Sequence, residues 1–198
     1  MITIITVTFL TSVLYASFFE WLLHRFIMHR PFFGFTYPFD RHARVHHRIF
    51  RADATYHLQQ PQDASTIPMA WWNALLLIPV ASLPFCIASW LSSGWTTWLT
   101  SLVTISAYYG AYEYLHWCMH LPKSRRLEFS WVFRKLNGHH VLHHRYMESN
   151  FNVVLPLADL CLGTLLLRSR IDFPQVRGPM VPNLQPRDGK TRGTKVAA

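Results

Sequence analysis

Three long apolar runs constrain the fold of this chain more than any other feature of its sequence. Residues 2–23 contain a single charged side chain, Glu20, and two further apolar runs cover residues 69–91 and 95–115. At 1.5 Å per residue, a helix over the first run is about 33 Å long, enough to cross a bilayer core of about 30 Å. The sequence therefore predicts an all-α integral membrane bundle with about three transmembrane helices.

The details of the three runs favour membrane spans over other apolar segments. A signal peptide would begin with basic residues, whereas the first basic residue here is Arg25, so we expect the first run to be a retained helix. Residues 92–94 leave room only for a tight hairpin between the second and third runs. Pro79 and Pro84 fall inside the second run, where a membrane helix tolerates them better than a soluble one.

The basic residues predict the topology of the bundle. Every Lys and Arg lies within residues 25–51 or after residue 122. Three crossings place both segments on one side, so the positive-inside rule puts them in the cytoplasm and the N-terminus outside. This distribution accounts for the net charge of +9, and no helix-turn-helix, zinc-finger or RNA-binding signature is present, which argues against nucleic acid as a partner.

The chain is expected to form one domain followed by a tail. Residues 1–170 would be the membrane-embedded domain, in which polar residues 116–150 form a partly helical cytoplasmic cap. Residues 151–167 are apolar but are interrupted by polar residues and Pro156, which predicts an interfacial helix rather than a fourth span. Residues 171–198 are basic and rich in Pro and Gly, and we expect them to be disordered. The three cysteines have no metal-like spacing, and a disulfide framework is not expected.

Ten of the twelve histidines fall into four short clusters, all on the predicted cytoplasmic side. The clusters are His24-x4-His29, His42-x3-His46-His47, His116-x3-His120 and His140-x2-His143-His144. Neutral imidazole binds iron, zinc, copper and nickel, so the ligand type alone does not identify a metal. Ten imidazoles exceed the positions around one ion and would suit two. We interpret the remaining two histidines, His57 and His139, as interfacial polar groups.

Helix geometry supports most of this predicted metal site. His116 and His120 share a helix face, as do the three histidines of the last cluster. His24 and His29 are separated by about 140° on an ideal helix. They can reach one site only if the helix ends or distorts there, and otherwise each serves a different metal.

Acidic side chains precede two of the clusters at helical offsets. Glu20 lies four residues before His24, and Glu113 lies three residues before His116. A metal-bound histidine commonly donates its other N–H to a carboxylate, so both are candidate outer partners of the ligands, as is Asp159. The alternative is that these carboxylates only mark the membrane–water boundary. No catalytic residue is predicted beyond the metal site itself.

The four clusters, in this order and with a membrane hairpin between the second and third, resemble the fatty acid hydroxylase superfamily of membrane histidine-rich di-iron enzymes. This superfamily includes sterol desaturase-like and carotene hydroxylase-like members. The resemblance covers residues 16–168. It includes the block that begins at Asn150, which adds Asn150 to the candidate outer partners, although Asn152 and Ala158 stand where Gly and Trp are usual.

The resemblance implies an oxidoreductase with two non-haem iron ions and O2 as co-substrate, although such a site can also be isolated with zinc. Its substrate would be an unactivated C–H of a membrane lipid, fatty acyl or sterol-like before carotenoid, undergoing hydroxylation or desaturation. The chain has neither a dinucleotide motif nor a haem-like or iron–sulfur-like cysteine set. A separate electron donor is therefore implied, either a cytochrome b5-like protein, a ferredoxin or a reductase.

Two functions of other classes stay open at this point. A zinc-dependent membrane hydrolase could use a histidine site to activate water, although no HExxH-type motif is present. A metal transporter would need ionisable residues near the membrane midplane, where these runs are apolar. The lack of an ER-retrieval ending favours a bacterial inner membrane as the location.

Overall fold

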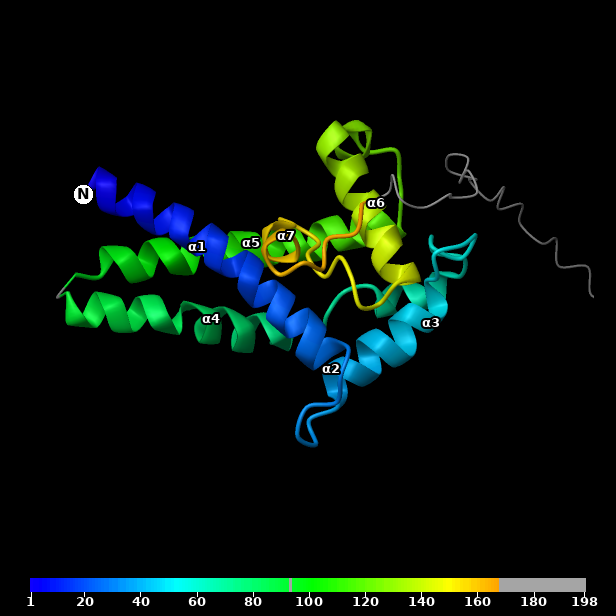
Figure 1. Ribbon diagram of the computed structural model, residues 1–198, viewed down its shortest axis with the longest axis horizontal. Coiled ribbons are helices and arrows are strands. Elements are labelled where there is room, and N and C mark those ends of the chain that lie inside the picture. The colour runs from blue at the N-terminus through cyan, green and yellow to red at the C-terminus, as the bar shows by residue number, and fades with distance from the viewer. Residues whose placement is uncertain (93, 168–198) are drawn as a thin grey trace, which may run out of the picture.

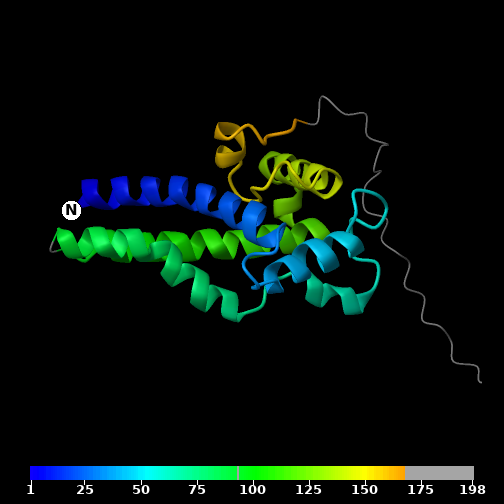
Figure 2. The ribbon, with the colours of Figure 1, turned by 60° about the horizontal axis from the view of Figure 1, so that its bottom comes forward.

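Three long helices form an elongated bundle in the computed structural model, which describes residues 1–92 and 94–167 (Figure 1). They are α1 (Ile2–Leu23), α4 (Trp72–Leu91) and α5 (Thr96–His120), and α5 packs against both of the others. The N-terminus lies at the same end of the bundle as the last turn of α4 and the first turn of α5 (Figures 1 and 2). The predicted runs therefore became three helices, of which α4 runs antiparallel to α1 and α5, and α5 continues five residues beyond the predicted run to His120.

Small side chains make the contacts inside this bundle. Ser12, Ala16 and Ser17 of α1 are buried, as are Ala81 of α4 and Ser101 of α5. Many large apolar side chains of the same helices point outward, with exposed fractions of about one half or more: Leu10, Leu14, Leu75, Leu83, Leu99 and Val103. Small residues inside and large apolar residues outside are the arrangement of helices that pack in lipid, where closely approaching backbones stabilise the contact.

Two helices of the described chain are long and apolar enough to cross a membrane. They are the continuous helix Ile2–Met28 and α4. The third predicted span corresponds to α5, which is as long but carries more Ser, Thr and Tyr because it lies between the other two helices. The presence of a third span therefore stays a prediction.

The other end of the bundle carries a group of short elements. After η1 (His24–Met28) come α2 (Tyr37–Phe39), η2 (Asp40–His46) and α3 (His47–Ile49), then η3 (Pro61–Thr66), which leads to α4. Beyond α5, η4 (Arg126–Phe129) precedes α6 (Trp131–Arg145), which begins where the Ser130 hydroxyl accepts a hydrogen bond from the Phe133 amide. Every predicted histidine cluster lies on these elements or at the adjoining ends of α1 and α5.

The segment that was expected to be an interfacial helix is mostly irregular. Only α7 (Leu157–Cys161) is helical, and it packs against α1 while Leu160 is largely exposed. Five helical residues cannot cross a bilayer, so this segment is not a fourth span. The predicted tail 171–198, and with it the proposed domain boundary at residue 170, lies outside the described residues.

Candidate metal centre

A π-turn at the end of α1 brings His24 and His29 together. The amide of His29 donates to the carbonyl of His24, 3.1 Å away, so the hydrogen bond spans five residues instead of four. This widened turn, η1, removes the angular offset that separates the two imidazoles on an ideal helix, and their ring centroids are 5.1 Å apart. The distortion that the sequence required for one shared site is therefore present.

A second π-turn does the same for His42 and His47. Within η2 the amide of His47 donates to the carbonyl of His42, again across five residues, and the two Nε2 atoms are 3.1 Å apart. His46, one residue earlier, consequently points to a different neighbour, His116, at 3.2 Å between Nε2 atoms. One short helix thus supplies histidines to two places.

Ordinary helical turns supply the remaining pairs. His116 and His120 lie one turn apart at the end of α5, and His140 and His144 lie one turn apart on α6. The Nε2 atom of His140 is 3.1 Å from that of His120 and 3.0 Å from that of His144. His143 faces His29 instead, at 3.1 Å. The three α6 histidines, predicted to share one face, are therefore divided between two neighbourhoods.

The ten clustered histidines form two groups of five, and in each group the ligand atoms all lie within 4.8 Å of one another. Group A consists of His24, His29, His42, His47 and His143, and group B consists of His46, His116, His120, His140 and His144. Nine of the ten side chains are buried and His29 is partly buried. The division agrees with the expectation that ten imidazoles would suit two ions.

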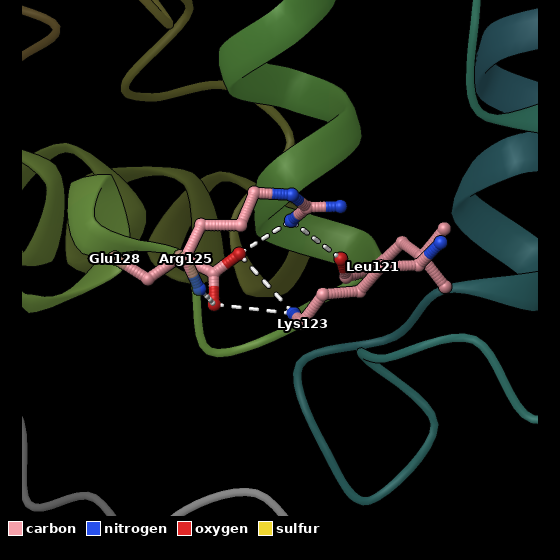
Figure 3. Close-up of polar contacts among 4 residues, drawn as sticks. All are labelled: Leu121, Lys123, Arg125 and Glu128. Atoms are coloured by element: carbon pink, nitrogen blue, oxygen red, sulfur yellow. Dashed lines mark hydrogen bonds and ion pairs between the residues drawn. The ribbon is translucent and has the colours of Figure 1, made fainter.

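Polar contacts in the connection between α5 and α6 hold the histidines that α5 contributes to group B beside those that α6 contributes. Glu128 accepts hydrogen bonds from the amides of Lys123 and Arg125, and its carboxylate pairs with the Arg125 guanidinium (Figure 3). The same guanidinium donates to the carbonyl of Leu121, directly after His120, at 3.0 Å. This compact turn therefore ties the end of α5 to the start of α6.

Backbone carbonyls orient the imidazoles. The Nδ1 atoms of five histidines lie within hydrogen-bond distance of carbonyl oxygens: His24 with Phe151, His143 with Ser149, His46 with Thr66, His120 with Tyr56 and His144 with Phe50. A carbonyl can only accept, so each Nδ1 carries the proton and each Nε2 keeps its lone pair. These Nε2 atoms are the ones that face into groups A and B, as metal binding requires.

The spacing of the Nε2 atoms fits a metal ion with more than four ligands. Neighbouring Nε2 atoms are 2.8 to 3.2 Å apart in the two groups. With metal–nitrogen bonds of about 2.1 Å, ligands at right angles are about 3.0 Å apart, whereas tetrahedral ligands are about 3.4 Å apart. Three pairs in each group have the spacing of ligands at right angles, and five donors exceed the four positions of a tetrahedral site.

Burial keeps these histidines neutral. It lowers the pKa of His143 to about 4 and, with the neighbouring His143 as second cause, the pKa of His29 to about 2. Burial first, and charge on adjacent imidazoles second, also hold the pKa of His47 and His140 well below the usual range. Metal binding needs the neutral form, so the groups are ready to bind at neutral pH.

The two glutamates do not occupy the role predicted for them. Glu20 accepts hydrogen bonds from Tyr108, Asn152 and the amide of Val153, at 2.6 to 3.1 Å, and is buried, so it marks no water boundary. The Nδ1–H of His24, the partner expected for Glu20, instead donates to the Phe151 carbonyl.

Glu113 instead accepts from the hydroxyl of Tyr109 and the amide of Met69. Both glutamates tether helices and loops, and the histidines use carbonyls where the sequence predicted carboxylates.

Asp159 and Asn150 support the histidines indirectly. The buried Asp159 carboxylate accepts from the amides of Phe151 and Asn152, at 2.9 and 2.7 Å, and so fixes the segment whose Phe151 carbonyl orients His24. Asn150, at φ +54°, bonds the carbonyls of His139 and Leu166 and follows the carbonyl that orients His143. Neither side chain bonds an imidazole of the two groups.

Sequence reasoning missed the residues that supply these carbonyls, because any residue can present one. Asn152 is a different case, because it stands where the resembled superfamily usually has Gly, and this departure is visible in the sequence. Its amide donates to Ser17 and Glu20 on α1, and its side-chain oxygen accepts from Asp159. His57 and His139 belong to neither group, and their interpretation as interfacial polar groups stays a prediction.

An apolar cavity with about 620 Å³ of empty space lies between α1, α4 and α5 and ends at group A, where His24 and Met28 line it. Tyr108 and Tyr109 line it with their rings, while their hydroxyls donate to Glu20 and Glu113. A smaller cavity near η2 touches one histidine of each group, His42 and His46. The larger cavity has the predominantly apolar lining that is typical of small-molecule sites.

Comparison with known proteins gives one match. The family model described as fatty acid hydroxylase matches residues 9–164, well over half of the chain. No curated protein and no solved structure matches the sequence or the fold. The matched range contains both groups of histidines and the three long helices.

Proposed function

The chain belongs to the fatty acid hydroxylase family, and we propose that it is a membrane-bound, O2-dependent lipid hydroxylase or desaturase that uses two iron ions. Members of this family are generally oxidoreductases. One observation carries the proposal: two groups of five neutral histidines lie side by side, and His24 of group A lines an apolar cavity between the long helices.

The proposed placement has α1, α4 and α5 crossing the bilayer, with the histidine groups at its cytoplasmic face and the N-terminus outside. The exposed Leu99 and Val103 of α5 support the third crossing, because a soluble helix would not leave them in water. The basic residues of the described chain lie at the histidine end, as the positive-inside rule expects of a cytoplasmic face.

The chain's own residues hold and shield the site. Groups A and B would each hold one ion through Nε2 atoms, and backbone carbonyls already orient five of the ten imidazoles, which reduces the ordering needed on binding. When bound, two iron ions supply the redox chemistry needed to activate O2 toward an unactivated C–H. The apolar cavity positions that C–H beside His24 and excludes water from the oxidation.

The cavity favours a lipid chain or ring system as substrate. Its walls are mostly apolar side chains, and the hydroxyls of two lining tyrosines, Tyr108 and Tyr109, are already hydrogen-bonded to glutamates. A fatty acyl chain or a sterol-like lipid fits such a lining, and a carotenoid ring is the alternative within the same family. Reducing equivalents would come from a separate donor, a cytochrome b5-like protein, a ferredoxin or a reductase.

The test is metal content followed by activity of the iron-loaded protein. We expect two iron ions per chain after reconstitution and a lipid product whose formation needs O2 and a reductant. Changing His140, His143 or His144 to Ala should abolish the product, and retained activity in all three variants would refute the proposal. Co-expression with a β-carotene pathway, followed by pigment chromatography, separates the carotenoid alternative.

The same experiment separates the other classes of function. A zinc hydrolase would act without O2, and a transporter would move metal ions across proteoliposomes. Neither is favoured by the site, because no carboxylate among the described residues belongs to group A or B to serve as a general base.

A further inference from the structure

A tight turn of three phenylalanines follows group A directly. Phe32 and Phe35 form an isolated β-bridge, closed by a 2.7 Å hydrogen bond from the amide of Phe35 to the carbonyl of Phe32. The two residues between them, Phe33 and Gly34, both have positive φ, +40° and +82°. We call residues 32–35 the Phe-turn.

The Phe-turn presents its aromatic rings to the outside. Phe33, at its tip, is 94% exposed, and Phe32 and Phe35 are exposed by more than two fifths. Turns of this shape favour Asn or Gly at both central positions, and a bulky residue at positive φ is strained. The Phe33 ring packs edge-to-face on that of Phe32, with ring centroids 4.8 Å apart, yet the Phe33 side chain stays almost fully exposed. The strained turn therefore presents a pair of aromatic rings to the surroundings of the protein.

The depth of the Phe-turn is set by the start of α4. Tyr37, two residues after the turn, packs on Trp72, the first residue of α4, with ring centroids 5.2 Å apart. Trp71, immediately before α4, is 79% exposed. Figures 1 and 2 place the Phe-turn, the blue loop beside α2, level with this end of α4 and projecting sideways from the bundle. In the proposed membrane placement, this end of α4 lies at the headgroup region of the bilayer, where aromatic belts occur, and the Phe-turn lies at the same depth.

Cationic side chains border the same surface. The Arg30 guanidinium, two residues before the Phe-turn, lies 5.7 Å from the Phe26 ring centroid, and that of Arg25 lies 5.5 Å from it. Arg30 is about half exposed, and its ion pair with Glu148 spans 3.6 Å. Exposed aromatic rings next to arginines suit a bilayer interface, where the rings contact the lipid chains and the guanidinium groups contact the lipid phosphates.

We infer that the Phe-turn inserts into the cytoplasmic leaflet of the membrane as an interfacial anchor. This inference rests on the proposed membrane placement of α1 and α4. The chain reaches the Phe-turn only two residues after His29, so the anchor holds η1, and group A with it, at the membrane surface. Lipid, and not a docked protein, is the partner that this surface contacts. A docked protein is the alternative that the experiment can detect.

Fluorescence quenching of the full-length protein in vesicles tests the anchor. An environment-sensitive probe is attached to a cysteine at position 33, 83 or 54, in a chain with Cys86→Ala and Cys161→Ala; the remaining thiol, Cys118, is buried. Leu83 is exposed in the middle of α4, and Ala54 is exposed in the loop after α3. The vesicles contain phosphatidylcholine, phosphatidylglycerol and a lipid with a shallow nitroxide, and iodide is the aqueous quencher.

We expect the shallow nitroxide lipid to quench the probe at position 33 at least as strongly as the deeper probe at position 83, with iodide quenching several-fold weaker than at position 54. Iodide quenching at position 33 equal to that at position 54 would overturn the anchor while leaving the enzyme proposal intact. Protection from both quenchers would overturn it in favour of a protein contact. Iodide access at position 83 would overturn the membrane placement, and the anchor with it.

Discussion

The His29 amide donates to the His24 carbonyl across five residues, at 3.1 Å, and this bond places two imidazoles in one group. The pair His42 and His47 repeats the same device. An isolated π-turn is less favourable than an α-turn and occurs most often at functional sites. Group A is thus built from two π-turns and His143, whereas group B is built from two α-helical pairs and His46.

Because the two groups draw on separate turns, each should lose its ion independently. We expect His29→Ala to reduce the bound metal from two ions to about one per chain, and His120→Ala to do the same by emptying the other group. The control is His57→Ala, which lies in neither group and should keep both ions. Elemental analysis with circular dichroism measures this, and loss of both ions from a folded single variant would contradict it.

Asp159 should affect group A alone. Asp159→Asn replaces one oxygen that accepts from a backbone amide with an NH2 group, which loosens the segment whose Phe151 carbonyl orients His24. Loss of such a support typically weakens metal affinity about 10- to 100-fold. Competition with a chelator should show one weakened and one unchanged site. Thr164→Ser, which keeps the hydroxyl that donates to Asp159 and accepts from the Trp21 indole, is the control, and equal weakening of both sites would refute the assignment.

Glu20 should matter for stability more than for metal content. Glu20→Gln leaves donors from Tyr108, Asn152 and Val153 facing an amide that accepts fewer bonds, a loss on the order of 2 kcal/mol. We expect a lower melting temperature in detergent with two ions retained. The exposed Glu148→Gln is the matched control and should change little. If the Glu20→Gln variant instead lost one ion, this prediction would be wrong, and Glu20 would act as a direct partner of His24.

The metal-free protein should lose stability in acid. Burial lowers the pKa of His143 from 6.5 to about 4, so the unfolded chain binds this proton more readily than the folded chain. The resulting stability is fully present above pH 6.5 and is lost as the pH falls toward 4, by about 3 kcal/mol for this group alone. Thermal melts of metal-free protein between pH 7 and pH 4 measure it. The His143→Gln variant should show a weaker dependence, and a flat profile for the parent protein would contradict the prediction.

Filling the apolar cavity should impair the reaction without disturbing the histidines. Ala81, buried on α4, lines the cavity, and Ala81→Leu would occupy space intended for substrate. We expect several-fold lower turnover of long lipid chains, with two ions still bound and an unchanged melting temperature. Ala88→Leu, at an exposed position of the same helix, is the matched control. Equal activity of the two variants would place the substrate elsewhere.

Local patterns in the sequence determined the helices and the ligand set. The apolar runs predicted α1, α4 and α5 because length and hydropathy act within each segment, and the clustered histidines were evident from their spacing alone. The sequence also required a distortion between His24 and His29, without indicating that it would be a π-turn. The number of ions expected, two, followed from simple counting against available coordination positions.

Only the tertiary structure decided how these parts combine. His46 and His47 are adjacent in the chain but serve different groups, because the π-turn of η2 turns one toward α5 and the other toward α6. The carbonyls that orient the imidazoles come from Phe50, Tyr56, Thr66, Ser149 and Phe151, and a carbonyl has no residue identity for a sequence to reveal. Glu20 and Glu113 became tethers because long-range packing brought them donors that their helical spacing to the histidines could not predict.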